Sequence, residues 1–116
     1  DVVESAKLFL LDYLASAMAG YKINRIFNEA LWNVVGGMGG KKESRVFFHK
    51  AKLPAPNAAL LNAAYGHGAD MDDGNRTAQG HPGVAVMPVA LCFAEAHRLA
   101  GRDAILAIAE AGSLKW

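Results

Sequence analysis

Apolar residues recur at helical spacing along most of this 116-residue chain, and this pattern restricts the fold more than any other feature. It is clearest in residues 2–19, where Glu4, Lys7 and Asp12 lie off the apolar stripe. The stripe itself consists of Val3, Ala6, Leu10, Tyr13, Leu14 and Ala17. Such spacing places apolar side chains on one face of a helix. We therefore predict a helix over residues 2–19 that ends at a C-cap glycine, Gly20.

A second helix is predicted over residues 24–35, with Asn24 as its N-cap. Its expected buried face is formed by Ile26, Phe27, Ala30, Leu31 and Val34. The glycine-rich residues 36–40 should end this helix, because glycine loses more backbone entropy than other residues when it becomes helical.

Three further helices are expected, over residues 57–65, 82–98 and 102–110. Pro56 is well placed to open the first of them. Pro88 lies inside the second, where it removes one backbone donor and should produce a kink or mark the true first turn. The pattern predicts an all-α fold of about five helices packed as a bundle.

Residues 45–49 form the only stretch with strand character, so we expect at most one short β element. No internal repeat and no linker divides the chain. A length of 116 residues suits one domain and is too short for two. The prediction is a single helical domain over residues 1–116.

Composition excludes several classes of function. The net charge is +1 and no basic block is interleaved with aromatic residues, so nucleic acid is not an expected partner. Charged residues such as Asp12, Lys22 and Glu95 interrupt the apolar stretches, so no membrane span is expected. Without a signal peptide, a cytoplasmic location is the expectation. The single cysteine, Cys92, lies in an apolar run and is predicted to be a buried thiol.

The polar loop between the third and fourth predicted helices carries most of the chemically active side chains. These are His67, Asp70, Asp72, Asp73 and His81, within fifteen positions. His67 and Asp70 are three residues apart, so a helical turn would place them on the same face. A carboxylate beside an imidazole holds the ring in one tautomer and raises its basicity, which suits proton transfer.

His81 directly precedes Pro82, at the entrance of the next predicted helix. The free backbone donors and the positive dipole end of that helix could receive a substrate carboxylate. The structural alternative is that the acids cap helix ends and the histidines pack in the interior. Three carboxylates this close repel one another, however, and capping needs only one of them.

Two kinds of metal site can be compared with the spacing of this loop. A calcium loop beginning at Asp70 needs a ligand at its fifth position, glycine at its sixth and glutamate at its twelfth. Those positions hold Gly74, Asn75 and His81, so the calcium interpretation fails. A transition-metal site using His67, Asp70 and His81 agrees with the ligand preferences of zinc or iron. Its spacing matches no standard motif, so neither a metal nor a cofactor is assigned.

Side chains outside this loop are predicted to be structural. His49 and His97 have basic neighbours typical of solvated surface. Met18, Met71 and Met87 are expected to fill gaps in the core.

Several segments, taken together and in order, resemble the MmgE/PrpD family, the group that includes 2-methylcitrate dehydratase. The similar segments are residues 6–14 with Gly20, residues 53–62, residues 67–73, residues 80–83 and residues 86–88. The similarity extends over nearly the whole chain to about Ile108. It implies a helical domain that works with a lid-like α/β domain in a longer polypeptide. The chain would then be an incomplete N-terminal piece of that helical domain.

The resemblance also implies roles for individual residues. The first aspartate of the family's acidic motif falls on Asp70, and the histidine of its His-Pro pair falls on His81. These two are therefore the expected catalytic residues, with His67, Asp72 and Asp73 as substrate-binding or supporting groups. Some members carry a threonine where this chain has Gly74, and the loop to His81 is one residue longer here.

The expected function is that of a metal-free, cofactor-free lyase domain that dehydrates 2-methylcitrate or a related tricarboxylic acid. Whether this chain alone is an enzyme stays open, because the family's lid and some of its catalytic groups come from outside it. The alternative is a non-catalytic helical oligomerisation module or enzyme remnant. Helices built to pack against absent parts should expose apolar surface, so we expect a homo-oligomer, a dimer or larger.

Overall fold

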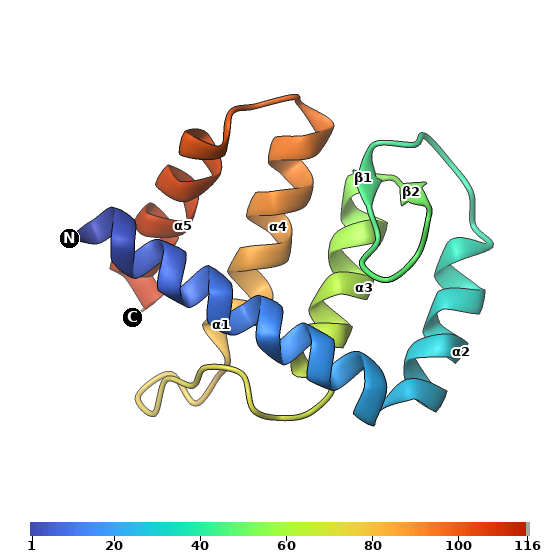
Figure 1. Cartoon of the computed structure of the whole chain (residues 1–116), viewed down its shortest axis with the longest axis horizontal. Helices are drawn as coiled ribbons and strands as arrows, with labels where there is room; N and C mark the ends of the chain where they lie inside the picture. Colours follow the sequence, from blue (N-terminus) through green and yellow to red (C-terminus); the bar gives the residue numbers. More distant parts are fainter. Residues whose placement is uncertain (116) are drawn as a thin grey trace.

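Five α-helices and one two-stranded hairpin form the protein in a computed structural model, which describes residues 1–115 and the side chains of residues 1–112 (Figure 1). The elements are α1 (Val2–Ile23), α2 (Arg25–Gly36), β1 (Ser44–Arg45), β2 (Lys52–Leu53), α3 (Ala55–His67), α4 (Pro82–Ala96) and α5 (Gly101–Lys115). The all-α prediction is confirmed; Trp116, the last residue of the predicted domain, lies outside the described residues. Within residues 1–115, no helix combines the length and apolar character needed to cross a bilayer.

Helix α1 crosses the other helices diagonally, with α3 and α4 side by side behind it (Figure 1). Helix α5 packs on α4 and α1, and α2 packs on α3. One buried cluster joins α1 to α2, α3, α4 and the hairpin through Ala17, Val35, Val46, Leu53, Ala58, Ala59, Leu61, Tyr65 and Cys92. A second joins α1 to α4 and α5 through Ala6, Tyr13, Met87 and Ile108.

Gly20 does not end the first helix as predicted, because α1 continues to Ile23. The glycine is buried against the end of α3. A Cβ atom added there would lie 2.0 Å from the carbonyl oxygen of Tyr65 and 2.9 Å from the backbone nitrogen of Gly68. The glycine is therefore explained by the close approach of two backbones and not by helix termination.

The predicted buried face of α2 is wrong. Four of its five residues are exposed: Ile26, Phe27, Ala30 and Val34. Only Leu31 is partly buried, while the fully buried residues are Asn28 and Val35. The Asn28 amide donates to the carbonyl oxygen of Gly20 at 3.1 Å, which also accepts from the backbone nitrogen of Asn24 at 3.0 Å, so Asn28 ties α2 to the end of α1. Helical spacing identified an apolar face, but that face is not the one that this chain buries.

The strand predicted over residues 45–49 is shorter and lies one residue earlier. Ser44 pairs with Leu53 and Arg45 pairs with Lys52 in an antiparallel hairpin. The chain then turns, and Phe48 adopts a left-handed conformation with φ of 67°.

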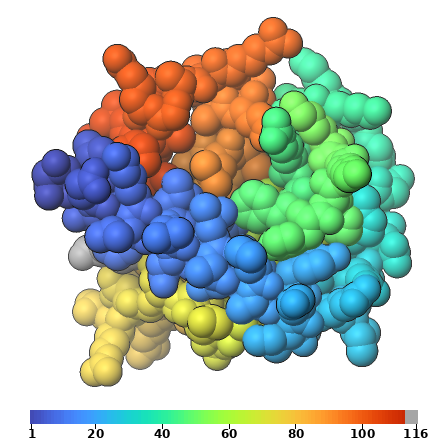
Figure 2. Space-filling model, in the orientation of Figure 1, coloured from blue at the N-terminus to red at the C-terminus, as the bar shows by residue number. Residues whose placement is uncertain are grey.

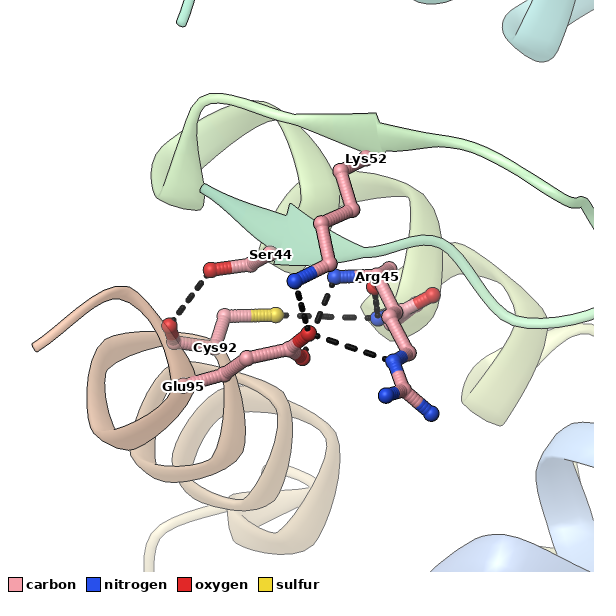
Figure 3. Close-up of polar contacts among 6 residues, drawn as sticks. Ser44, Arg45, Lys52, Cys92 and Glu95 are labelled. Atoms are coloured by element: carbon pink, nitrogen blue, oxygen red, sulfur yellow. Dashed lines mark hydrogen bonds and ion pairs between the residues drawn. The ribbon is translucent and has the colours of Figure 1, made fainter. Parts of the chain in front are cut away.

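Helix α4 holds the hairpin through polar contacts (Figure 3). The Ser44 hydroxyl donates to the carbonyl oxygen of Cys92. The Glu95 carboxylate lies between two cations, with Oε1 3.2 Å from Arg45 Nε and 3.2 Å from Lys52 Nζ. These contacts tie both strands to one helix.

Helix α3 holds the hairpin through the buried side chain of Asn62. Its amide nitrogen donates to the carbonyl oxygen of Arg45 at 3.0 Å. Its amide oxygen accepts from the backbone nitrogen of Phe47 at 2.9 Å. The carbonyl oxygen of Asn62 in turn accepts from the Tyr13 hydroxyl at 2.8 Å, so one residue links α1, α3 and the hairpin.

Helix α4 begins at Pro82 as predicted and ends two residues before the predicted boundary. Pro88 is accommodated inside it and is buried.

Cys92 is buried as predicted, and burial raises the pKa of its thiol to about 11. Met87 is fully buried, but the other two methionines predicted to fill the core are exposed: Met18 and Met71.

His49 is not the solvated surface residue that its neighbours suggested. Its ring stacks on Trp32, with centroids 4.0 Å apart and planes 13° apart. Its Nε2 lies 3.1 Å from the hydroxyl of Tyr65, within hydrogen-bond distance. Loss of solvent around the ring lowers the pKa of His49, partly offset by the charge of Glu29.

Candidate functional site

The candidate site lies on the loop between α3 and α4, at the lower edge of the molecule in Figures 1 and 2 (yellow). Helix α3 ends at His67, and His81 occupies the N-cap position of α4. The two histidines therefore stand at opposite ends of the same loop. They meet in space, with ring centroids 4.7 Å apart and ring planes at 65°.

Asp72 lies between these two imidazoles. Its Oδ1 is 3.0 Å from Nδ1 of His67, and its Oδ2 is 3.1 Å from Nδ1 of His81. The side chain of Asp72 is only 2 % exposed, so these contacts compensate a carboxylate that water scarcely reaches. His67 thus pairs with Asp72, and not with Asp70 as the three-residue spacing suggested. The spacing rule fails because the chain leaves the helix after His67.

Asp70 approaches His81 from the other side of the ring. Its Oδ1 lies 3.8 Å from Nε2 of His81, and its side chain is 79 % exposed. The backbone of Asp70 is left-handed, with φ of 51°, and its nitrogen donates to the carbonyl oxygen of His67 at 3.0 Å. Aspartate tolerates this conformation better than most residues do. Asp70 and His81, the two residues expected to be catalytic, therefore lie close together.

Asp73 makes a capping contact with the start of α4. Its Oδ1 accepts from the backbone nitrogen of Gly83, at 2.8 Å, in the first turn of α4. A Cβ atom added at Gly83 would lie 2.6 Å from that oxygen, so glycine permits the close approach. One of the helix donors expected to receive a substrate carboxylate is therefore already occupied.

A small closed turn precedes His81, and the motif analysis missed it. Asn75 and Gly80 form an isolated bridge, with Asn75 N donating to Gly80 O at 2.8 Å. The side-chain oxygen of Asn75 accepts from the backbone nitrogen of Ala78 at 2.9 Å, as in an Asx turn. The sequence did contain a sign of this turn, since Asn75 stands five residues before Gly80 and both residue types favour turns. The turn shortens the loop and brings His81 back towards His67.

The sequence model of the MmgE/PrpD N-terminal domain matches residues 1–112. This chain belongs to the MmgE/PrpD family. Searches of curated proteins and of solved structures each found no significant match. In this MmgE/PrpD domain, the residues that carry the resemblance at the acidic motif and at the His-Pro pair are brought together at one edge of the helices.

The side chains of this cluster are of types that can exchange protons or bind a cation. His67 and Asp72 lie within hydrogen-bond distance, at 3.0 Å, and His81 lies within 4 Å of both Asp72 and Asp70, so imidazole and carboxylate groups are placed as in a general acid–base pair. One donor atom from each of four residues can be chosen so that all lie within 4.8 Å of one another: His67, Asp70, Asp72 and His81. Imidazole nitrogen and carboxylate oxygen are ligands for zinc and related metals.

Proposed function

We propose that this MmgE/PrpD domain contributes the acid–base groups that dehydrate 2-methylcitrate or a related tricarboxylic acid. The observation that carries the proposal is the approach of two carboxylates to opposite nitrogens of one imidazole. Asp72 lies beside Nδ1 of His81, and Asp70 lies beside Nε2. Burial distinguishes the two acids, since Asp72 is enclosed and Asp70 faces solvent.

Dehydration breaks a C–H bond alpha to a carboxylate and a C–O bond on the adjacent carbon. A base takes the proton, a double bond forms, and an acid protonates the departing hydroxyl group so that it leaves as water. Asp72 lies against Nδ1 of His81 on the protected side of the ring. Nε2 of His81 and the carboxylate of Asp70 then face the exposed side, where a small carboxylic acid can approach. His67 adds a second imidazole beside the same position.

The side chains of the site are open to solvent on one side, with His67 51 % exposed and His81 36 % exposed. Dehydration benefits from exclusion of water, because proton transfer and charge stabilisation are stronger in a dry site. We propose that further protein closes this side in the working enzyme, in the manner of the lid that the family resemblance implies. The reaction itself needs no metal or other cofactor in this proposal.

The test is the His81→Ala variant, with formation of the unsaturated acid followed by its absorbance. Loss of a general acid–base group should lower kcat/KM by about 10²- to 10⁴-fold. His97→Ala is the matched control, because His97 is exposed and its ring contacts Phe93 and not the site. Unchanged turnover and substrate affinity in His81→Ala would remove this residue from the mechanism.

A second candidate is a non-catalytic helical module that works by self-association. It is favoured by the apolar side chains that α2 leaves in solvent, with Ile26 90 % exposed. Direct assay with 2-methylcitrate and cis-aconitate separates the two candidates. Turnover, or binding of either acid that His81→Ala weakens, supports the lyase, and a folded sample that neither turns over nor binds these acids supports the module.

A further inference from the structure

We propose that His67, Asp72 and His81, with Asp70 as a fourth ligand, bind a Zn²⁺ ion, and that this ion competes with the acid substrate. Zinc is here an inhibitor of the site and not a cofactor. Binding of the ion does not depend on the proposed function; competition with substrate does.

The distances already approach those of a zinc site. Ligand atoms about 2.1 Å from a tetrahedral zinc ion are separated from one another by roughly 3.4 Å. Asp72 lies 3.0 Å from Nδ1 of His67 and 3.1 Å from Nδ1 of His81, the two nitrogens that would face the ion, whereas Asp70 approaches His81 on its Nε2 side. Small side-chain movements within the loop are enough to direct four donors at one ion, since donor atoms from all four residues already lie within 4.8 Å of one another.

One ring nitrogen of this cluster lacks a hydrogen bond. Nδ1 of His81 is buried and has no hydrogen-bond partner among the described residues. It lies 3.1 Å from Oδ2 of Asp72, but the contact does not have hydrogen-bond alignment. A buried polar atom without a partner is costly, and a metal ion would remove that cost by accepting the nitrogen lone pair.

The types of ligand select the metal. Two imidazoles with carboxylates suit zinc, whereas calcium and magnesium prefer sites made only of oxygen. Asp73 is directed at the backbone of Gly83, so the cluster offers few further oxygens for a larger coordination shell. The only cysteine, Cys92, is buried in α4 beside the hairpin, where its sulfur lies 3.6 Å from the amide nitrogen of Asn62. It therefore does not supply a thiolate ligand to this cluster.

Occupation by zinc would block the proposed chemistry. The ion takes the lone pairs of His81 and His67, so neither imidazole can accept a proton from the substrate. It also draws Asp70 away from the exposed face. Substrate and zinc therefore cannot use His81 at the same time, and each should weaken the binding of the other.

Zinc binding is tested first on the protein without substrate, by calorimetry and by the visible absorption of bound Co²⁺. We expect one ion per chain and a Co²⁺ spectrum of four-coordinate type. His67→Ala should weaken zinc binding at least about tenfold, since loss of even an outer partner of a ligand costs that much. His97→Ala is the control and should bind zinc as the parent protein does. Equal affinity in the two variants would overturn the proposal.

Asp72→Asn provides a second variant, because it keeps the shape of the side chain and removes its charge. Circular dichroism checks that the variant is folded, and exposed Asp12→Asn is the matched control. We expect Asp72→Asn to weaken zinc binding at least about tenfold. Parental zinc affinity in a folded Asp72→Asn protein would also overturn the proposal.

Competition is tested by measuring the Kd of 2-methylcitrate at several free Zn²⁺ concentrations held constant by a chelator buffer. The buffer is needed because the acid itself binds zinc. The apparent Kd should rise with free Zn²⁺, and a constant Kd would overturn the competition. If the acid does not bind at all, the proposed function fails, while the zinc titrations still decide the metal site.

Discussion

Asp72 shows how the surroundings of one side chain assign its role. The sequence places three aspartates within four positions, and nothing in their order says which is enclosed. In the folded chain Asp72 lies between two imidazoles, Asp73 caps a helix and Asp70 faces solvent. These roles follow from where the chain leaves α3, which spacing alone does not reveal. The sequence predicted which polar side chains this loop carries, but not how they pair in space; their catalytic role stays a prediction.

His49 provides a test at the residue scale. Its pKa is lowered because the ring is partly removed from water between Trp32 and Tyr65. An unfolded histidine has a pKa of about 6.5, so the unfolded chain takes up a proton at this residue before the folded chain does. The stability due to the neutral ring is therefore complete above about pH 6.5 and is lost as the pH falls towards the lower folded pKa.

The variant His49→Phe keeps an aromatic ring against Trp32 but cannot bind a proton. Its free energy of unfolding should decrease less than that of the parent protein between about pH 7.5 and about pH 5. Urea unfolding at the two pH values measures this difference. His97→Phe serves as the control, because His97 is exposed. A parental pH dependence in His49→Phe would contradict the assignment.

At the scale of helices and strands, the number and order of helices were predictable, but some boundaries and faces were not. Periodic apolar residues and proline positions located all five helices. Gly20 was misassigned because a helix C-cap and a close backbone contact both favour glycine, and only the packed structure distinguishes them. The face of α2 was misassigned because periodicity does not identify the partner of an apolar surface.

Gly20→Ala tests the contact between α1 and α3. The added methyl group would clash with the backbone carbonyl oxygen of Tyr65, which cannot move away without distorting the end of α3. We expect the free energy of unfolding to fall by about 3 kcal/mol, despite the better helix propensity of alanine. Gly101→Ala, at the start of α5, is the control, because an added Cβ there has no neighbour within 4 Å. Its free energy of unfolding should change by less than about 1 kcal/mol. Denaturant titration of the two variants makes the comparison, and a similar small effect in both would contradict the close contact.

At the scale of the whole molecule, apolar surface remains uncovered on several helices. The exposed apolar residues of α2 include Ile26 and Phe27, and those of α1 include Leu8 and Leu11. Surfaces of this kind favour association. This agrees with the expectation of a homo-oligomer, which stays a prediction.

We expect the protein to be a dimer or larger by light scattering at micromolar concentration. Ile26→Glu should shift this assembly towards monomer, because it places a charge in the apolar surface of α2. Thr77→Glu adds the same charge at an exposed polar position of the loop before α4 and should leave the assembly unchanged, whereas Asn33 would be unsuitable because it lies seven residues after Ile26 on the same helix face. A strictly monomeric parent protein would show that this surface does not associate.

The left-handed backbone at Asp70 has a consequence for sequence divergence. Glycine and asparagine suit that conformation without the charge, whereas glutamate keeps the charge and suits the conformation poorly. Aspartate alone meets both demands. Under the proposed function, a lineage that kept the fold and abandoned the reaction would be free to drift towards glycine or asparagine here, so the residue found at this one position in a descendant would indicate whether the proposed chemistry had survived.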